Sequence, residues 1–308
     1  MAEKQPKVSI VFVNFNGEKD SAQLIDSIKK IKYKNYNIIV VDNKSSKKLS
    51  SKFKQKYKKD IVLIENSRNT GLAEGTNIGI REALKKNSKY VLVMNNDMIV
   101  KKDFLNPLVE VMESNSNIAV SSSKMYYMKP KNMIWSAGCD YHTYGYKSRQ
   151  QGEIDKTQDE KNKEVDALDC VLLMRSSVLK KIGLLDSKFF IICEFTEWCL
   201  RAKNKGYKIL YVPASIIWHK ISSSLNKIQT SNKTEVYYNS RNWLLTIKKN
   251  KSSLYFLWVF FLHSTIFALI RLMKYSKQRK AKLILNYYIG TWHALTDKTP
   301  LKLYPYKS

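Results

Sequence analysis

The chain has 308 residues and a formal net charge of +28, with 54 Lys and Arg against 26 Asp and Glu. Its 44% hydrophobic content excludes global disorder, and its length allows one large domain, or one domain of about 220 residues with an appendage. So large a positive charge attracts polyanions, which include nucleic acid, anionic membranes and phosphorylated substrates. Charge alone therefore identifies no partner.

Two features indicate the compartment. The four cysteines form no C-x-x-C pair and show no spacing typical of a metal site, so we expect reduced thiols in a cytosolic protein. The N-terminal MAEKQPK is polar and leads directly into a strand-like run, which predicts no signal peptide. We expect the catalytic part to stay in the cytoplasm.

Strands and helices alternate in the first hundred residues. Apolar runs, each followed by polar residues, predict buried strands over 8–13, 38–41, 62–64 and 90–94. A helical pattern with Leu24, Ile25, Ile28 and Ile31 on one face separates the first two. Such βαβ units predict a mainly parallel sheet, with the functional residues gathered along one edge.

The stretch NTGLAEGTNIGI, residues 69–80, is rich in glycine but matches neither G-x-G-x-x-G nor a P-loop. A helix beginning near Ala73 would carry Gly75 and Gly79 on one face. Small residues there allow either close packing against a strand or close approach to a flat ligand. The sequence leaves both interpretations open.

Asp97 is the first candidate for chemistry. The apolar run 90–94 ends in Asn95-Asn96-Asp97, and a carboxylate at the carboxyl end of a buried strand lies at the ligand-binding rim of an α/β sheet. Asp97 either holds a metal ion against a phosphorylated substrate or caps a turn.

Further elements follow in the second half. We expect helices over 103–112 and 178–185, the latter ended by Gly183, and strands over 118–121, 171–174 and 207–212. Residues 145–165 are almost wholly polar, which predicts an exposed, mobile loop that acts as a lid or binds substrate, unless it is simply disordered.

Two acids share a face of a predicted helix that runs from Glu194 to Gly206. Glu197 has a structural explanation, because Arg201 lies four residues on, in the favourable order for an ion pair. Glu194 has none. His219 ends a short apolar stretch, and a lone His in such a place is more often structural than a ligand.

The motifs, taken together and in this order, resemble a family 2 glycosyltransferase of the inverting, nucleotide-sugar-dependent kind, in its rhamnosyltransferase-like branch. The resemblance runs from about residue 7 to residue 295. It rests on VSIVFVNFNG, VVDNKSS, NTGLAEGTNIGI, NNDMIV, the EVD followed by LLMRSSVLKKIGLLD, EFTEWCLRAKNKGYKILYVPASIIWHK and YYNSRNWLL.

The resemblance implies a nucleotide-binding α/β fold of the GT-A type, which agrees with the mainly parallel central sheet predicted above. It also implies a divalent ion, Mg²⁺ or Mn²⁺, with Asn95-Asn96-Asp97 in place of a D-x-D motif. The implied metal ligands are Asp97 and His219, and the implied nucleotide-binding residues are Asn14, Asn16, Asp42, Asn69, Gly71, Asn77 and Asn96.

The general base is where the sequence departs from the family pattern. Aligning on Trp198-Cys199-Leu200-Arg201 puts the first acid of the family's pair at Glu194, but Phe195 occupies the usual catalytic position. Phenylalanine cannot accept a proton. The base is therefore Glu194 or, in second place, Glu197, unless the local register is shifted or the protein is impaired.

The C-terminal apolar stretch, residues 254–270, is at the lower length limit for a membrane span. Basic residues flank both of its ends, and Asp297 is the single acid between residues 248 and 308. A segment that lies in the interface, or a re-entrant hairpin with 283–289, keeps both basic clusters cytoplasmic. The alternative is a buried helix that forms a homodimer.

These observations predict a catalytic domain over 1–222 and a helical, membrane-associating or dimerising region over 223–308. The expected function is metal-dependent, inverting transfer of a sugar from a nucleoside-diphosphate sugar to a lipid-linked or cell-surface glycan, by a peripheral or monotopic protein on the cytoplasmic face of an anionic membrane. A nucleotidyltransferase and a non-catalytic nucleotide-sugar-binding protein are the alternatives. We expect no nucleic-acid partner, since the sequence carries no nucleic-acid motif.

Overall fold

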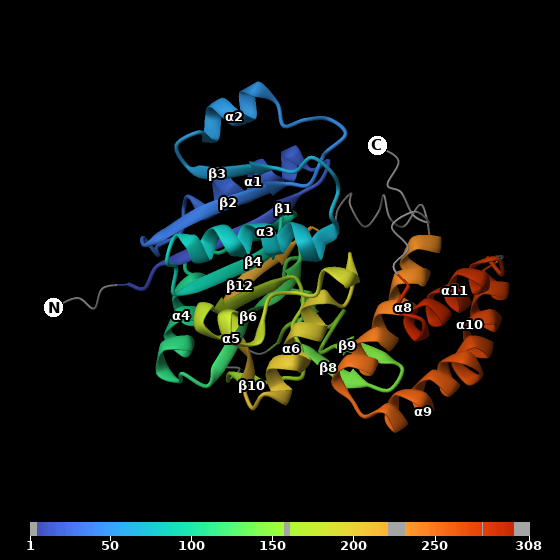
Figure 1. Ribbon diagram of the computed structural model, residues 1–308. Coiled ribbons are helices and arrows are strands. Elements are labelled where there is room, and N and C mark those ends of the chain that lie inside the picture. Colours follow the sequence, from blue (N-terminus) through green and yellow to red (C-terminus); the bar gives the residue numbers. More distant parts are fainter. Residues whose placement is uncertain (1–4, 157–160, 221–231, 279, 299–308) are drawn as a thin grey trace.

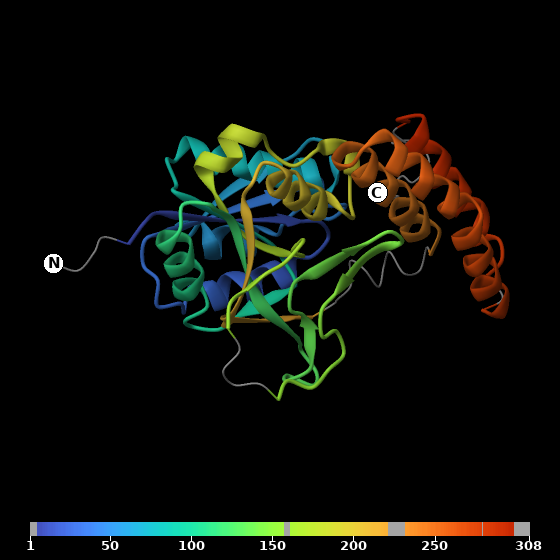
Figure 2. The same ribbon diagram turned by 90° about the horizontal axis from the view of Figure 1, so that it is seen from below.

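The structure is a computed structural model that describes residues 5–156, 161–220, 232–278 and 280–298. A twisted ten-stranded sheet, covered by helices, forms the larger part, and a group of C-terminal helices lies beside it (Figures 1 and 2). The predicted domain boundary at 222 lies outside the described residues.

The sheet agrees with the predicted βαβ pattern. Its strands are β1 (Val8–Asn14), β2 (Tyr36–Asp42), β3 (Ile61–Glu65), β4 (Tyr90–Asn95), β5 (Met98–Val100), β6 (Ile118–Tyr127), β7 (Ile134–Ser136), β10 (Lys163–Glu164), β11 (Val171–Arg175) and β12 (Lys208–His219). The order is β10-β12-β6-β11-β4-β1-β2-β3, with β5 beside β12 and β7 beside β6. β1 to β4 are parallel, as are β6 and β12, and β11 runs antiparallel between β4 and β6. The sheet is therefore mostly parallel, as predicted.

Helices cover both faces because alternate residues of each strand point to opposite sides. In β1, Ile10 and Phe12 join one apolar core, whereas Val11 and Val13 join the other. The first core includes residues of α1 (Glu18–Ile28), α2 (Ser51–Tyr57) and α4 (Leu105–Ser114); the second includes residues of α3 (Gly71–Lys85), α5 (Ser176–Ile182) and α6 (Glu194–Asn204). A 3₁₀ turn, η1 (Ser187–Phe189), precedes α6. The helix predicted over 178–185 ends early, at Ile182, but Gly183 follows it with φ +89° as the expected breaker.

Of the two interpretations of Gly75 and Gly79, the structure supports close packing of the helix against a strand. A Cβ at Gly79 would overlap the Cγ1 atom of Val11, and one at Gly75 would lie 3.2 Å from Val13. Both glycines therefore let α3 approach β1 closely. Gly71 differs, because it has φ +81° and lies against Phe190 at the edge of a cavity.

Residues 145–165 are not wholly a mobile loop. β9 (Gly145–Ser148) pairs with β8 (Cys139–His142) as a hairpin, and β10 lies further on; residues 157–160 lie outside the described part. The hairpin tip reaches the C-terminal helices, where the carbonyl oxygen of Thr143 accepts a hydrogen bond of 3.1 Å from the indole of Trp243. The prediction of a mobile loop was therefore wrong at residues 145–148, where backbone pairing orders a segment of polar composition, whereas most of the described residues from 149 to 164 are exposed, as predicted.

The C-terminal helices are α8 (Asn232–Asn250), α9 (Ser253–Ser264), α10 (Ile266–Lys277) and α11 (Leu283–Leu295). α8 and α11 pack closely, since a Cβ at Gly290 would lie 2.5 Å from the carbonyl oxygen of Tyr237. Residues 253–277 form the one helical stretch in the described part that is long and apolar enough to cross a membrane, with mean hydropathy 1.9. It is interrupted at Thr265, where α9 ends and α10 begins.

Candidate active site

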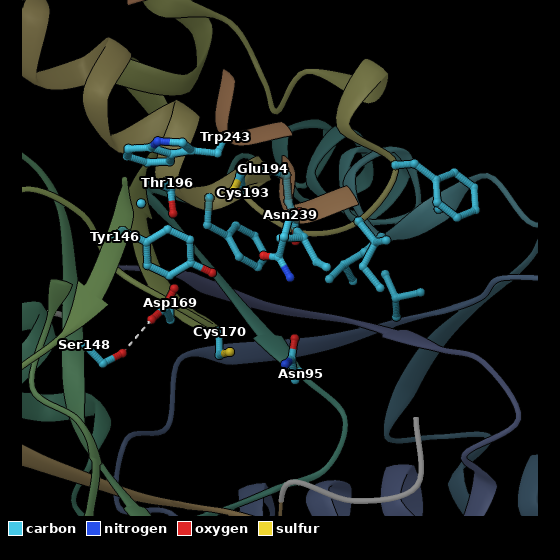
Figure 3. Close-up of a pocket in the computed structure, with 18 of the residues that line it drawn as sticks. Asn95, Tyr146, Ser148, Asp169, Cys170, Cys193, Glu194, Thr196, Asn239 and Trp243 are labelled. Carbon is cyan, nitrogen blue, oxygen red and sulfur yellow. Dashed lines mark hydrogen bonds between the residues drawn. The ribbon is translucent and has the colours of Figure 1, made fainter. Parts of the chain in front are cut away.

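A cavity of about 890 Å³ lies where the sheet edge, the β8–β9 hairpin and the C-terminal helices meet. Its wall includes Asn95 at the end of β4, Asp169 before β11, Glu194 at the start of α6 and Trp243 of α8 (Figure 3). Residues from both parts of the fold thus share one space. Most of the predicted site residues line it, but some do not.

Asn14 and Asp42 brace the strand ends from behind the cavity wall. The Asn14 side-chain amide donates hydrogen bonds to Asp42 Oδ1, at 2.6 Å, and to Ser45 Oγ, at 3.1 Å. Asn14 and Asp42 are both buried and neither lines the cavity. Within the described structure, both are positioned to hold the strand ends together.

Asn16, Asn69, Gly71 and Asn96 do line the cavity. Asn43, which was not among the predicted site residues, holds two of them in place. Its side-chain amide donates hydrogen bonds to Asn69 Oδ1 at 2.9 Å and to the carbonyl oxygen of Gly71 at 3.0 Å. Asn43 lines the cavity too. Its place directly after a buried strand was the signal that could have identified it.

Asn77 lies elsewhere. Its side chain donates to the carbonyl oxygen of Leu185 at 2.8 Å and accepts from the backbone N–H of the same residue at 3.0 Å. The amide joins α3 to the segment after α5, and it is not part of the cavity wall.

Asp97 and His219 meet, as the resemblance implied. The first follows β4 and the second ends β12, which pairs with β5, and Asp97 Oδ1 lies 3.1 Å from His219 Nε2. Both side chains are buried, the Trp135 and His219 rings pack edge to face, and among the described residues His219 Nδ1 has no hydrogen-bond partner. Asp97 also lines the cavity.

This pair fits a divalent ion as an incomplete ligand set. In the described part of the chain, no group of three or more His, Cys, Asp or Glu is arranged to hold a metal. Mg²⁺ in phosphoryl sites commonly takes one or two protein ligands and fills its remaining positions with water and substrate phosphate. A buried carboxylate and imidazole beside an open cavity match that requirement.

Glu194 begins α6 and is only 3% exposed, yet it faces the cavity. Within the part of the chain that the structure describes, its Oε2 atom has no hydrogen-bond partner. Burial raises the pKa of this carboxyl from 4.5 to about 7, and the charge of Asp169 contributes in the same direction. A carboxyl with a pKa near neutrality and a free oxygen is suited to general-base chemistry.

The backbone before Glu194 is strained. Phe190, Ile192 and Cys193 have φ values of 57°, 72° and 68°, in the left-handed region that side chains disfavour. Asn242 of α8 holds this segment, because its amide nitrogen lies within 2.8 Å of the carbonyl oxygens of Phe189, Ile191 and Ile192.

Glu197, the second predicted base, does not reach the cavity. It is fully buried and forms a two-pronged ion pair with Arg201, at 3.1 and 3.0 Å. Arg201 in turn donates to the carbonyl oxygens of Ile182 and Leu184, so the pair ties α6 to the end of α5. Phe195, in contrast, lines the cavity next to Glu194.

Asp169, Tyr146 and Trp243 also line the cavity, although no sequence motif identified them. Asp169 is half-buried in the cavity wall, accepts hydrogen bonds from Ser148 Oγ at 3.2 Å and Cys139 Sγ at 2.8 Å, and has its pKa raised by desolvation (Figure 3). Tyr146 and Trp243 add aromatic surface, with ring centroids 6.3 Å apart. Its place two residues before the apolar run 171–174 was the only sequence signal for Asp169.

Comparison with known families decides the class of protein. A family model described as "Glycosyl transferase family 2" matches residues 9–183, which is more than half of the chain. The chain belongs to glycosyl transferase family 2. Its matched segment includes β1 to β4 and Asp97, whereas Glu194 and the C-terminal helices lie beyond it.

Relatives of this family 2 chain carry glycosyltransferase names. It is 26% identical over 245 residues to dTDP-rhamnosyl transferase RfbF of Shigella flexneri, covering 78% of this chain and 79% of that protein. It is 28% identical over 207 residues to the low-salt glycan biosynthesis hexosyltransferase Agl10 of Haloferax volcanii, covering 66% of this chain and 63% of that protein. The protein is thus a glycosyltransferase, similar to rhamnosyl- and hexosyltransferases.

Solved structures confirm the GT-A fold class. A structure of GalNAc-T7 with UDP, GalNAc and Mn²⁺ has a TM-score of 0.64 at 19% identity, over 80% of this chain and 48% of that one. Mannosyltransferase PcManGT from Pyrobaculum calidifontis, with GDP-Man and Mn²⁺, has a TM-score of 0.58 at 11% identity, over 96% and 88% of the two chains. At these identities the likeness establishes the fold alone.

Proposed function

We propose that the protein transfers a hexosyl or rhamnosyl group from a nucleoside-diphosphate sugar, with inversion, to a lipid-linked or cell-surface glycan. One observation carries this proposal above all. A single cavity contains both the carboxylate of Asp97, beside His219, and the free carboxylate oxygen of Glu194. Inverting transfer requires a site for a leaving diphosphate and a base for the acceptor hydroxyl in the same space.

The donor end is assigned to the sheet edge. Asn16, Asn69, Gly71 and Asn96 offer polar groups and a close backbone approach for the nucleotide, with Asn14 and Asp42 as supports behind them. Asp97 and His219 would hold Mg²⁺ or Mn²⁺, which supplies Lewis-acid neutralisation of the charge on the leaving diphosphate. A nucleotide-activated sugar also appears in the name of the Shigella flexneri relative, and both solved structures are complexes with Mn²⁺.

Glu194 takes the role of base. The acceptor hydroxyl oxygen bonds to the anomeric carbon as the bond from that carbon to the diphosphate oxygen breaks, and the diphosphate leaves with the electron pair. Glu194 Oε2 receives the hydroxyl proton. Phe195 cannot do this, and Glu197 is neutralised by Arg201 outside the cavity.

The C-terminal helices are assigned to an anionic membrane surface. Leu254, Leu257 and Phe261 of α9 are 81%, 54% and 62% exposed, and they belong to a larger set of exposed apolar side chains on α9 to α11. Between residues 232 and 298, Glu235 and Asp297 are the only acids among many Lys and Arg. Apolar side chains flanked by cations favour an interfacial position on the cytoplasmic leaflet. Association of two copies through this surface is the alternative that vesicle binding tests.

The donor and the metal are tested together. Thermal stabilisation by UDP-, dTDP- and GDP-sugars with Mn²⁺ identifies the nucleotide, since a ligand of the folded state raises its melting temperature. Transfer or hydrolysis of that donor should then disappear in Asp97→Ala, while the circular dichroism spectrum is unchanged. Full turnover by the variant would remove Asp97 from the mechanism.

A further inference from the structure

Arg271 of α10 is a cation in the cavity wall that neither the family resemblance nor the proposed donor site explains. It is half-buried, and its guanidinium carbon lies 5.1 Å from the ring centroid of Tyr287. Among the residues that the structure describes, no carboxylate lies within 4.0 Å of it. His263, which lines the cavity as well, has its pKa lowered to about 4 by burial, so it is neutral at pH 7.

The position of Arg271 separates it from the donor end. Figures 1 and 2 show α10 on the outer side of α8, away from the ends of β1, β2 and β4 where the nucleotide is assigned. Trp243 of α8 and the hairpin residue Tyr146 lie within the same cavity wall. Arg271 packs on Tyr287, whose hydroxyl lies 3.0 Å from His263 Nδ1, and His263 Nε2 in turn lies 3.4 Å from the carbonyl oxygen of Thr143 in the hairpin. Arg271 therefore lies on the side of the cavity that the hairpin and the C-terminal helices form, and we assign this side to the acceptor.

Arg271 also lies within the exposed apolar surface. The adjacent residues Ile270 and Leu272 are 50% and 37% exposed, and Leu269 and Met273 exceed 50%. Lys274 follows on the same helix. One side chain thus faces the cavity, while its neighbours along the helix face the proposed membrane.

We infer that Arg271 binds the phosphate through which a lipid anchor is joined to the acceptor sugar. The guanidinium fork matches phosphate oxygens in geometry and charge, and no described carboxylate competes for it. With the phosphate there, the sugar extends past Trp243 toward Glu194 and the lipid leaves along the apolar surface of α9 and α10. This assignment rests on the proposed function and narrows its acceptor to lipid phosphates or diphosphates.

Binding of farnesyl diphosphate and of farnesol, in decyl maltoside micelles with EDTA, tests the inference by isothermal titration calorimetry. EDTA removes divalent ions, so diphosphate is not held at Asp97. The full-length protein should prefer farnesyl diphosphate at least about tenfold, as one lost charge-assisted bidentate contact predicts. Arg271→Gln should lose this preference, and Arg271→Lys should keep part of it.

Lys274→Gln is the matched control, because it removes one exposed charge from the same helix. An unchanged preference in Arg271→Gln would overturn the inference. Equal losses in Arg271→Gln and Lys274→Gln would also overturn it, by indicating general attraction of anions to the surface. The readout needs no sugar transfer, so a failure here is distinct from a failure of the proposed function, which the donor assay measures.

Discussion

The side-chain amide of Asn242 donates a hydrogen bond of 2.8 Å to the carbonyl oxygen of Ile192, two residues before Glu194. Because Phe189 and Ile191 offer their carbonyl oxygens to the same amide, α8 fixes a backbone segment that would otherwise relax from its left-handed conformation. The proposed base is therefore aimed by a residue 48 positions later in the chain.

Asn242→Leu keeps a similar volume but removes the donor, which leaves buried carbonyl oxygens unpaired. We expect the free energy of unfolding to fall by about 2–3 kcal/mol. Since Glu194 would also move, kcat should fall by at least about tenfold, with the KM for donor nearly unchanged. Asn250→Leu, on the same helix but at its end, is the control and should retain its kcat. A loss of stability with wild-type kcat would limit Asn242 to a structural role.

The pH dependence of turnover tests Glu194. A base must be unprotonated, so activity should be low below the pKa, rise with pH through about 7, and level off above it. Glu194→Gln should lower kcat by about 10²- to 10⁴-fold and remove this rise. The measurement is kcat at saturating donor from about pH 5.5 to about pH 9, a range that includes the expected midpoint. An unaltered profile in the variant would assign the titration to another group.

The same pKa has a consequence for stability. Between the unfolded value of 4.5 and the folded value of about 7, the folded protein binds the proton that the unfolded chain has lost, so stability falls as pH rises. Above pH 7 the accumulated cost is roughly 3 kcal/mol. Glu194→Gln should therefore unfold at higher urea concentration than wild type at pH 8, and the two should agree near pH 4. The opposite ranking at pH 8 would mean that a partner stabilises the carboxylate.

Phe195 offers a test of neighbouring charge. Phe195→Asp places a carboxylate beside Glu194, and like charges raise each other's pKa. The midpoint of the activity profile should move to higher pH. Phe195→Asn loses the same packing without adding charge, so its midpoint should stay near that of wild type. If the two variants have the same midpoint, a charge at position 195 does not change the pKa of the group that titrates.

His219 offers the corresponding test at the proposed metal site. His219→Ala removes one of the two proposed ligands, so the Mn²⁺ concentration for half-maximal activity should rise by about 10- to 100-fold, with partial recovery at saturating Mn²⁺. His293→Ala, in α11, controls for the loss of an imidazole. If His219→Ala needs no more Mn²⁺ than wild type, the pairing of Asp97 and His219 is structural.

The sequence was sufficient where local pattern decides structure. Buried strands such as β1 and β4 are continuous apolar runs with polar ends, so their positions and their common edge followed from the residues. Asp97 and His219 were brought together only through the family resemblance, since 122 positions separate them. Their contact depends on the pairing of β12 with β5, which no local pattern specifies.

The part of the cavity that we assign to the acceptor could not be predicted from the sequence. Tyr146 lies in a stretch whose polar composition predicted a mobile loop, but it is half-buried and its ring packs against Trp243 of α8. Asn242 and Trp243 lie in a segment that the resemblance covered without assigning any role. Long-range contacts order both regions, and single-residue propensities carry no information about such contacts.

The contact between the hairpin carbonyl of Thr143 and the indole of Trp243 bears on how this enzyme can be divided. A protein cut after residue 222 would keep the sheet and Asp97 but lose Asn242, Trp243 and Arg271. Such a fragment would retain the surface assigned to the nucleotide and lack the part of the cavity wall that we assign to the acceptor. The sheet and the C-terminal helices together are therefore the smallest unit that we expect to transfer a sugar.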